Sequence, residues 1–319
     1  MAEIGKDIDY AQSLLERGAL VAIPTETVYG LAGNAFNPKA VAHIFEVKQR
    51  PAFDPLIAHT HSLEALTELV THIPEAAQKL ADACWPGPLT LLLPRKSIIP
   101  DLVTSGLETV AVRIPKQELT LELLRQLSFP LVAPSANPFG YVSPTTAEHV
   151  NDQLGHKIDY ILNGGACQIG IESTIVGFND AEQPTIYRLG GTSKESIEKV
   201  IGPVHVNDHS SSNPKAPGML ASHYSPGKKI ILGSFEELQA YPKNKSTAAI
   251  TFSRPLADIN EDYAIILAKD GEVTTAAQHL FAALRALDRP EVEVILAEKA
   301  PEHGLGLAIN DRLKRAAVK

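Results

Sequence analysis

Two cations stand two residues apart in the segment Lys48-Gln49-Arg50-Pro51, at the end of a helix predicted over 38–48. Pro51 disfavours the α conformation at Arg50, so the chain is expected to leave the helix there, and in extended form both cations could face one anion. Arginine supplies a planar fork of donors and lysine a point charge, which together suit a polyphosphate. The alternative is two solvated cations that stabilise a helix C-terminus.

Polar side chains also follow several predicted strands. Thr25, Glu26 and Thr27 come directly after the apolar run 20–23. Such residues can hydrogen-bond a small ligand at a strand end, where open α/β sheets bind their ligands, although a plain strand-to-helix turn has the same composition. The other segments of this kind are His59, Arg113, Ala133-Pro134-Ser135-Ala136-Asn137, Ser143-Pro144-Thr145, Glu172-Ser173-Thr174 and Arg188-Leu189-Gly190-Gly191.

Two of these residues have a structural alternative. Arg113 ends an apolar strand and needs an anionic partner, which is either a ligand carboxylate or an Asp or Glu of the protein. His59, also at a strand end, is by itself more typical of a structural histidine than of a ligand contact.

Predicted strands and helices alternate along the chain and position these residues. Residues 1–201 predict an α/β domain with one large, mixed, twisted sheet and helices on its faces. Residues 202–228 hold 12 Pro, Gly or Ser in 27 positions and predict a linker, in which His223 and Tyr224 suggest a lid. Residues 229–319 predict a smaller Rossmann-like α/β domain. Expected strands are 20–23, 56–58, 90–93, 110–114, 131–133, 160–162, 174–178, 185–188, 229–232, 248–252, 263–267 and 293–297; expected helices are 7–17, 38–48, 62–69, 74–83, 118–127, 146–154, 235–240, 274–287 and 306–316.

Composition excludes several classes of protein. The chain has 319 residues, a formal net charge of −8 and two cysteines, which argues against extensive direct nucleic-acid binding and against a disulfide framework. No apolar run is long enough for a membrane span and the N-terminus lacks a hydrophobic signal core, so a soluble, cytoplasmic protein with no membrane partner is expected. The tail 310–319 is basic, which is typical of a solubilising helix end.

The motifs in series resemble the YrdC-like threonylcarbamoyl-AMP synthase family, in its two-domain form with an extra C-terminal domain. The resemblance covers essentially the whole chain. It rests on P-T-E-T-V-Y-G-L, K-x-R-P, D-P-L-I-A-H, W-P-G-P-L-T, V-R-I-P, A-P-S-A-N, E-S-T-I-V, R-L-G, A-P-G-M and H-Y-S-P.

The resemblance implies an enzyme, a nucleotidyltransferase that converts L-threonine, bicarbonate and ATP into L-threonylcarbamoyladenylate and diphosphate. The product would feed tRNA threonylcarbamoyladenosine modification through a downstream transferase machinery. Mg²⁺ would accompany ATP, and no residue is assigned as a metal ligand. Lys48 and Arg50 would be catalytic by neutralising the departing diphosphate. Threonine would be held by Thr27, His59, Arg113, Ala133 and Ser173, and ATP by Lys48, Arg50, Asp54, Thr109, Ser135, Ser143, Arg188 and Tyr224.

Two positions depart from the family pattern. Many members have Asn where this chain has Asp54, and an ionised carboxylate would repel a phosphate. Some members have Lys-Tyr-Arg where this linker has Leu220-Ala221-Ser222, which makes the lid less basic.

Two other functions compete with the synthase. One is a carbamoyltransferase that forms a carbamoyl-adenylate, although related larger proteins carry zinc-binding Cys pairs that this chain lacks. The other is a non-enzymatic RNA-binding module, which the acidic balance disfavours.

Overall fold

A computed structural model describes residues 1–207, 216 and 223–318 of the chain, which group into two compact units. The first unit contains 1–139, 144–168, 172–207 and Ala216, and the second contains 140–143, 169–171 and 223–318. Two short segments of the predicted first domain therefore group with the C-terminal residues. No helix in the described part is long and apolar enough to cross a bilayer.

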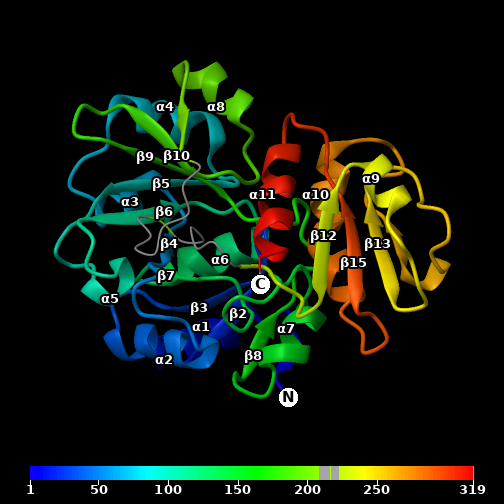
Figure 1. Ribbon diagram of the computed structural model, residues 1–319. Helices are drawn as coiled ribbons and strands as arrows, with labels where there is room; N and C mark the ends of the chain where they lie inside the picture. The colour runs from blue at the N-terminus through cyan, green and yellow to red at the C-terminus, as the bar shows by residue number, and fades with distance from the viewer. Residues whose placement is uncertain (208–215, 217–222, 319) are drawn as a thin grey trace. The chain divides into compact units, whose positions relative to one another are not determined.

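The first unit is built on an eleven-stranded sheet with the order β1-β8-β2-β3-β7-β4-β6-β5-β9-β10-β11, in which parallel and antiparallel pairs are mixed (Figure 1). Its strands are β1 Glu3–Gly5, β2 Val21–Ile23, β3 Gly30–Asn34, β4 Ile57–His59, β5 Leu89–Pro94, β6 Thr109–Arg113, β7 Leu131–Val132, β8 Tyr160–Leu162, β9 Thr174–Phe178, β10 Pro184–Arg188 and β11 His205–Val206. Its helices are α1 Ile8–Glu16, α2 Pro38–Lys48, α3 Leu63–Thr67, α4 Glu75–Cys84, α5 Asp101–Thr104, α6 Glu118–Gln126, α7 Ala147–Leu154 and α8 Lys194–Ile201. The prediction of a large mixed sheet with helices is confirmed.

Local chemistry sets the bounds of α2, the helix that leads to the two cations. The Asn37 side chain accepts from the backbone N–H groups of Lys39 and Ala40, and Pro38 occupies the first turn. Gln49 ends the helix in a left-handed conformation with φ 54°. The chain thus leaves the helix directly before Arg50, as the proline after it predicts.

The two faces of this sheet are covered differently. Since alternate strand residues point to opposite faces, Val110 and Val112 of β6 join the large core cluster that also contains residues of α2, α4, α7 and α8. On the opposite face, α1 and α6 cover β2, β3, β7 and β8. Ala111 of β6 lies on that opposite face but belongs to a separate small cluster, which consists of Ile57, Leu92, Ala111, Ile175 and Ala216 with Tyr187 packed against it.

We call the surface formed by that small cluster the open strip. Among the described residues, its members come from strands β4, β5, β6, β9 and β10, with Ala216 of the predicted linker as the one exception. Ala216 is fully buried. One residue of the predicted linker therefore packs onto this part of the sheet.

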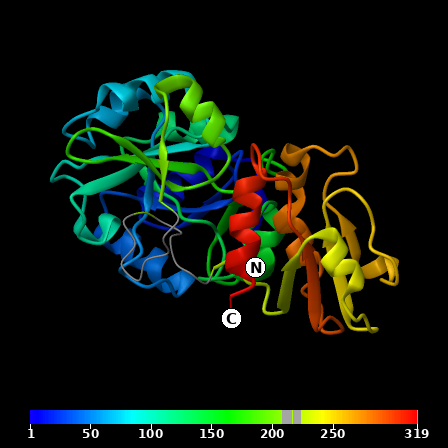
Figure 2. The ribbon, with the colours of Figure 1, turned by 45° about the horizontal axis from the view of Figure 1, so that its top comes forward.

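The second unit carries a four-stranded sheet in the order β12-β15-β13-β14 with all neighbouring strands parallel. Helices α10 and α11 lie on one face of it and α9 on the other (Figures 1 and 2). This order differs from the 3-2-1-4-5-6 order of Rossmann folds, although strands and helices alternate as predicted. The elements are β12 Lys229–Gly233, α9 Phe235–Ala240, β13 Thr247–Thr251, a 3-10 turn Glu261–Tyr263, β14 Ala264–Ile266, α10 Val273–Ala286, β15 Val294–Glu298 and α11 Gly306–Ala316.

Three expectations from the sequence need correction. The segment after β2 leads into β3, which pairs antiparallel with β2, so the alternative of a plain strand-to-helix turn is wrong. The predicted linker starts too early, because His205–Val206 forms β11 beside β10. The basic tail is not a mere solubilising helix end, because Arg312 of α11 is fully buried with its guanidinium carbon 5.3 Å from the centroid of the Tyr224 ring.

Candidate active site

Arg113, the last residue of β6, is the centre of a buried cluster. Its guanidinium pairs with the Glu26 carboxylate at 2.7 Å, and its Nη1 donates to Thr27 Oγ1 at 2.9 Å. Its Nε donates to the Gly87 carbonyl at 3.2 Å. Of the two partners that the sequence left open, the structure therefore supplies a carboxylate of the protein. A planar guanidinium is also suited to a bidentate bond with a ligand carboxylate.

The loop that carries Glu26 and Thr27 is folded by its own hydroxyl groups. Thr25 Oγ1 accepts from the backbone N–H groups of Thr27 and Val28, at 3.2 and 3.1 Å, and donates to the Val28 carbonyl at 2.6 Å. This is the local turn that a threonine hydroxyl favours. The turn aims the Thr27 hydroxyl at Arg113.

His59 is buried close to Arg113 and remains neutral. Its Nδ1 donates to the Ile57 carbonyl at 3.1 Å. Burial, and then the positive charge of Arg113, lower the pKa of His59 to about 3. The imidazole therefore offers hydrogen bonds without a charge at neutral pH. It projects from the same face of β4 as Ile57 of the open strip.

Lys48 and Arg50 are buried rather than solvated, which rules out the alternative of two exposed helix-end cations. Lys48 is 1% exposed, and its Nζ donates to the carbonyls of Ser135 and Asn137, the latter at 2.5 Å. Burial, followed by the nearby Arg50, holds the pKa of Lys48 well below its usual value. The lysine thereby ties the end of α2 to the loop after β7.

Asp54 pairs with Arg50 instead of facing a phosphate alone. Its carboxylate lies 2.8 Å from Arg50 Nη2, and the two side chains are 0% and 6% exposed. The Arg50 guanidinium also donates to the carbonyls of Asp54 and Pro55, at 3.1 and 2.8 Å. The structure thus places Asp54 as the partner that fixes the orientation of Arg50.

Ser173 and Arg188 form a third group, between β9 and β10. Arg188 donates through Nε and Nη2 to the Ser173 carbonyl, at 3.1 and 3.0 Å, and through Nη2 to the Ser173 hydroxyl at 3.1 Å. The Thr90 hydroxyl lies 2.7 Å from the same serine oxygen. Gly190 is required nearby, because a Cβ there would lie 2.5 Å from the carbonyl carbon of Ser173.

The loop after β7 joins the first two groups. Gly30 forms a bridge with Ser135, and a Cβ at Gly30 would lie 3.0 Å from the Cβ of Ala133. On its other side the same loop accepts from Lys48. Thr27, Ala133, Ser135 and Lys48 therefore belong to one continuous stretch of packed loops.

Thr109 lies away from these groups, at the start of β6. It lines a cavity of about 370 Å³ together with Leu92 and Tyr187, which belong to the open strip. Since Thr109, Ala111 and Arg113 alternate along β6, they share one face. The open strip thus connects Thr109 with Arg113.

Ser143 and Tyr224 lie in the second unit. Both are buried, and Tyr224 stacks on Phe281 of α10 with ring centroids 5.5 Å apart. His223 packs edge-on against Tyr224. Leu220-Ala221-Ser222, where the sequence departs from the family pattern, and the residues of the A-P-G-M motif after Ala216 fall outside the described residues.

Sequence reasoning missed the roles of Glu26 and Thr90 as partners of predicted site residues. The role of Glu26 could have been inferred, because burying a carboxylate directly after a buried strand costs free energy unless a cation pairs with it. The role of Thr90 could not have been inferred, since threonine is common inside strands.

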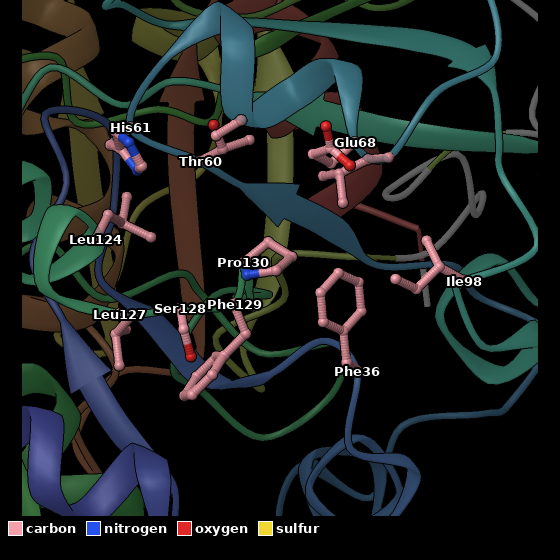
Figure 3. Close-up of a pocket in the computed structure, with 12 residues that line it drawn as sticks. Phe36, Thr60, His61, Glu68, Ile98, Leu124, Leu127, Ser128, Phe129 and Pro130 are labelled. Carbon is pink, nitrogen blue, oxygen red and sulfur yellow. The ribbon is translucent and has the colours of Figure 1, made fainter.

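A second cavity, of about 310 Å³, was not expected (Figure 3). Phe36, Phe129 and Pro130 point into it from one side, and Thr60, His61 and Glu68 lie across from them. Its wall is mostly apolar and it contains none of the predicted site residues. It is distinct from the cavity that Thr109 lines.

The described residues contain no group of three or more His, Cys, Asp or Glu side chains that could hold a metal ion. Two buried carboxylates beside predicted site residues, Glu26 and Asp54, each pair with an arginine. A divalent cation would therefore depend on ligand oxygens rather than on a protein cage.

Comparison with known proteins gives matches over both units. A model of the Sua5, YciO and YrdC family, described as telomere recombination, matches residues 13–190, and one described as the threonylcarbamoyl-AMP synthase C-terminal domain matches 192–318. Threonylcarbamoyl-AMP synthase of Pyrococcus abyssi is 42% identical over 323 aligned positions, covering 97% of this chain and 94% of the relative. That of Bacillus subtilis is 41% identical over 321 positions, covering 97% and 92%. A crystal structure of P. abyssi Sua5 complexed with L-threonine has a TM-score of 0.91 at 40% identity and covers 99% of this chain and 97% of that one.

Proposed function

Because the chain belongs to the Sua5, YciO and YrdC family, we propose that it is an L-threonylcarbamoyladenylate synthase. It takes L-threonine, bicarbonate or CO₂, and ATP, and it releases threonylcarbamoyl-AMP and diphosphate. The similar proteins of P. abyssi and B. subtilis carry the name of this activity, and the similar structure contains L-threonine.

The observation that carries the proposal is the pairing of two kinds of buried cation around one loop. Arg113 suits the carboxylate of an amino acid, while Lys48 and Arg50 suit a polyphosphate. Lys48 contacts the loop from Ala133 to Asn137 directly, and the segment that carries Thr27, the partner of Arg113, continues to Gly30, which bridges Ser135 of the same loop. An amino acid and a nucleotide would therefore be held close enough to react.

The chemistry needs no covalent bond to the enzyme. The threonine ammonium and bicarbonate give a carbamate with loss of water and one proton. A carbamate oxygen then attacks the α-phosphorus, and the bond to the bridging oxygen of diphosphate breaks. Lys48 and Arg50 stabilise the charge on the departing diphosphate, while Thr27, His59, Arg113, Ser173 and the Ala133 backbone hold threonine, so catalysis consists of positioning and electrostatic stabilisation.

Mg²⁺ would arrive with ATP. The residues near Lys48 and Arg50 fit a cation that is held mainly by phosphate oxygens, since Asp54 is the one carboxylate among them and it pairs with Arg50. The ion would supply charge neutralisation on the phosphates.

The remaining proposed ATP contacts are Ser135, Thr109, Arg188, Ser143 and Tyr224. The proposed lid falls mostly on residues 208–222, of which the structure describes only Ala216, buried against the open strip. A lid closed over the substrates would shield the labile carbamate from water. We further propose a cytoplasmic location, in keeping with two free cysteines and with delivery of the product to a tRNA-modifying transferase.

A substrate-dependence assay tests the proposal. The protein is incubated with ATP, Mg²⁺ and bicarbonate, and AMP-containing products are identified by mass. Diphosphate release that requires both threonine and bicarbonate, with a threonylcarbamoyl-adenylate mass, is the expected result. Release triggered by carbamoyl phosphate instead would identify the carbamoyl-adenylate reaction, and no release with either substrate would leave a non-enzymatic role.

A further inference from the structure

The four residues 140–143 group with the second unit although the residues on both sides group with the first. Both ends of this loop are anchored in the first unit. The Phe139 N–H donates to the Lys48 carbonyl at 2.8 Å, and the Pro144 carbonyl accepts from the Tyr29 N–H at 2.9 Å. Ser143, assigned above to ATP, is the last residue of the loop.

Helix α10 of the second unit holds the middle of this loop. Arg285, in the last turn of α10, donates to the carbonyls of Val142 and Ser143, the latter at 3.3 Å. Its guanidinium carbon lies 5.1 Å from the centroid of the Tyr141 ring. The Tyr141 hydroxyl donates to the Asp288 carboxylate at 2.5 Å. Burial, and then this carboxylate, raise the pKa of the Tyr141 phenol, so it keeps the proton that it donates.

The same face of α10 contacts two more segments next to predicted site residues. Phe281, one turn before Arg285, stacks on Tyr224, and the Ser225 N–H donates to the Gly140 carbonyl at 2.9 Å. One turn earlier, Gly170 approaches so closely that a Cβ would lie 2.5 Å from the Cα of Gln278. Positions 278, 281 and 285 follow the helical repeat, so one stripe of α10 orders three loops.

We propose that Arg285 is a positioning residue for ATP, acting through the Ser143 loop. This inference rests on the proposed function, since it assumes that Ser143 contacts ATP. A planar guanidinium that bonds two consecutive carbonyls fixes the peptide between them, and the peptide fixes the direction of the Ser143 side chain. Without the fork, the loop keeps the contacts at its ends, the Ser225 contact at Gly140 and the Tyr141 hydrogen bond, but the peptide between Val142 and Ser143 loses its donors. Ser143 then samples orientations that do not bind the nucleotide.

The test compares Arg285→Ala, Arg285→Lys and Tyr141→Phe in the full-length protein. The dissociation constant of ATP with Mg²⁺, and the KM values for ATP and threonine, are measured for each. We expect Arg285→Ala to weaken ATP binding about tenfold with little change in the KM for threonine, because it removes charge-assisted hydrogen bonds. Arg285→Lys should be intermediate, since an ammonium lacks the fork, and Tyr141→Phe should show a smaller loss. Arg289→Ala, an exposed arginine just beyond the same helix, is the matched control and should leave ATP binding unchanged.

A double-mutant cycle with Ser143→Ala separates positioning from general destabilisation. If Arg285 acts through Ser143, Arg285→Ala adds little to the loss already caused by Ser143→Ala. Two outcomes would overturn the positioning role of Arg285 but leave the ATP contact of Ser143 in place. One is normal ATP affinity in Arg285→Ala with impaired affinity in Ser143→Ala, and the other is full additivity of the two losses. Normal ATP affinity in Ser143→Ala would remove the assumed ATP contact and this inference with it, whereas intact threonine-dependent diphosphate release would leave the synthase activity standing. If Arg285→Ala does not fold, the same double-mutant cycle is measured with Tyr141→Phe in its place.

Discussion

Arg113 and Arg50 each lie against a buried carboxylate, yet the two ion pairs are built differently. Arg50 and Asp54 belong to one short segment and stand four residues apart, whereas Arg113 and Glu26 come from distant parts of the sequence. The first pair therefore shapes a loop, and the second ties the loop after β2 to the end of β6. The same motif, an arginine with a carboxylate, orients Arg50, the cation proposed to bind phosphate, in one place and ties two distant segments together in the other.

Each arginine also acts on a buried titratable neighbour. Arg50 contributes to the lowered pKa of Lys48, and Arg113 contributes to the lowered pKa of His59. Lys48 is surrounded by carbonyl oxygens of the loop after β7, while His59 donates to the Ile57 carbonyl. Burial and a neighbouring arginine thus disfavour the charged form of both side chains.

The largest effect is expected from breaking the long-range pair. Arg113→Met leaves the Glu26 carboxylate buried without its cation, so the free energy of unfolding should fall by about 3–5 kcal/mol. Denaturant titration measures it. Arg95→Met is the control, because the Arg95 partner Asp101 is exposed and that pair contributes at most about 1 kcal/mol. Equal losses in the two variants would refute a structural role for the Arg113 pair.

Removing both cations on the phosphate side should act on catalysis. Lys48→Ala combined with Arg50→Ala is expected to slow threonine-dependent diphosphate release about 10²–10³-fold, because two groups that stabilise transition-state charge are lost. Threonine affinity should remain, since Arg113 is untouched. The control with equal charge, Lys39→Ala with Lys79→Ala, removes exposed lysines. Unaltered turnover in the first double variant would contradict the assignment.

The neutral His59 predicts a dependence of stability on pH. Its pKa is about 3 in the folded chain against an ordinary value of 6.5, so at acidic pH the unfolded chain binds a proton that the folded chain does not. The contribution is fully present above about pH 6.5 and is lost as the pH falls, by about 2 kcal/mol between about pH 7.5 and about pH 5. Denaturation curves of the wild type and His59→Gln should diverge in that window. His156→Gln, at an exposed histidine, should follow the wild type, and parallel curves for all three would disprove the burial of a neutral imidazole.

The smallest effect is expected at Asp54. Asp54→Asn keeps an oxygen that accepts from Arg50, and the KM for ATP should change by no more than about threefold, or below about 1 kcal/mol. Asp54→Ala removes the acceptor and should raise this KM about tenfold. Kinetics with varied ATP measure both variants. Equally large defects in the asparagine and alanine variants would instead argue for a direct role of the carboxylate charge.

Much of the fold was predictable because apolar periodicity and caps are local signals. Asn37, Pro38 and Pro51 define α2 from sequence alone, and the runs around Val21, Leu91 and Val112 match strands. The strands β1, β3 and β11 were missed, because β3 is rich in Gly and Ala and the other two span three and two residues. The partners of these edge and short strands come from tertiary context, which overrides weak propensity.

The candidate site was predictable as a set of residues but not as an arrangement. Arg113 and Lys48 are conspicuous as charges beside apolar segments, whereas the pairing of Glu26 with Arg113 depends on how distant loops fold. Burial of Arg312 was not foreseen for the same reason, since a basic tail gives no sign of the Tyr224 ring that packs near it. Sequence spacing identifies candidates, and packing decides which of them meet.

The segments 140–143 and 169–171 show that the boundary between the two units is not a single point in the chain. A chimaera made by exchanging only the residues after the linker would contain a new α10 but would keep the original two internal loops. Those loops would no longer match the surface of the helix. Such chimaeras should carry mismatched loops beside Ser143 and Glu172. The second unit is therefore encoded by separate stretches of the gene, and we expect the internal loops and α10 to change together in evolution.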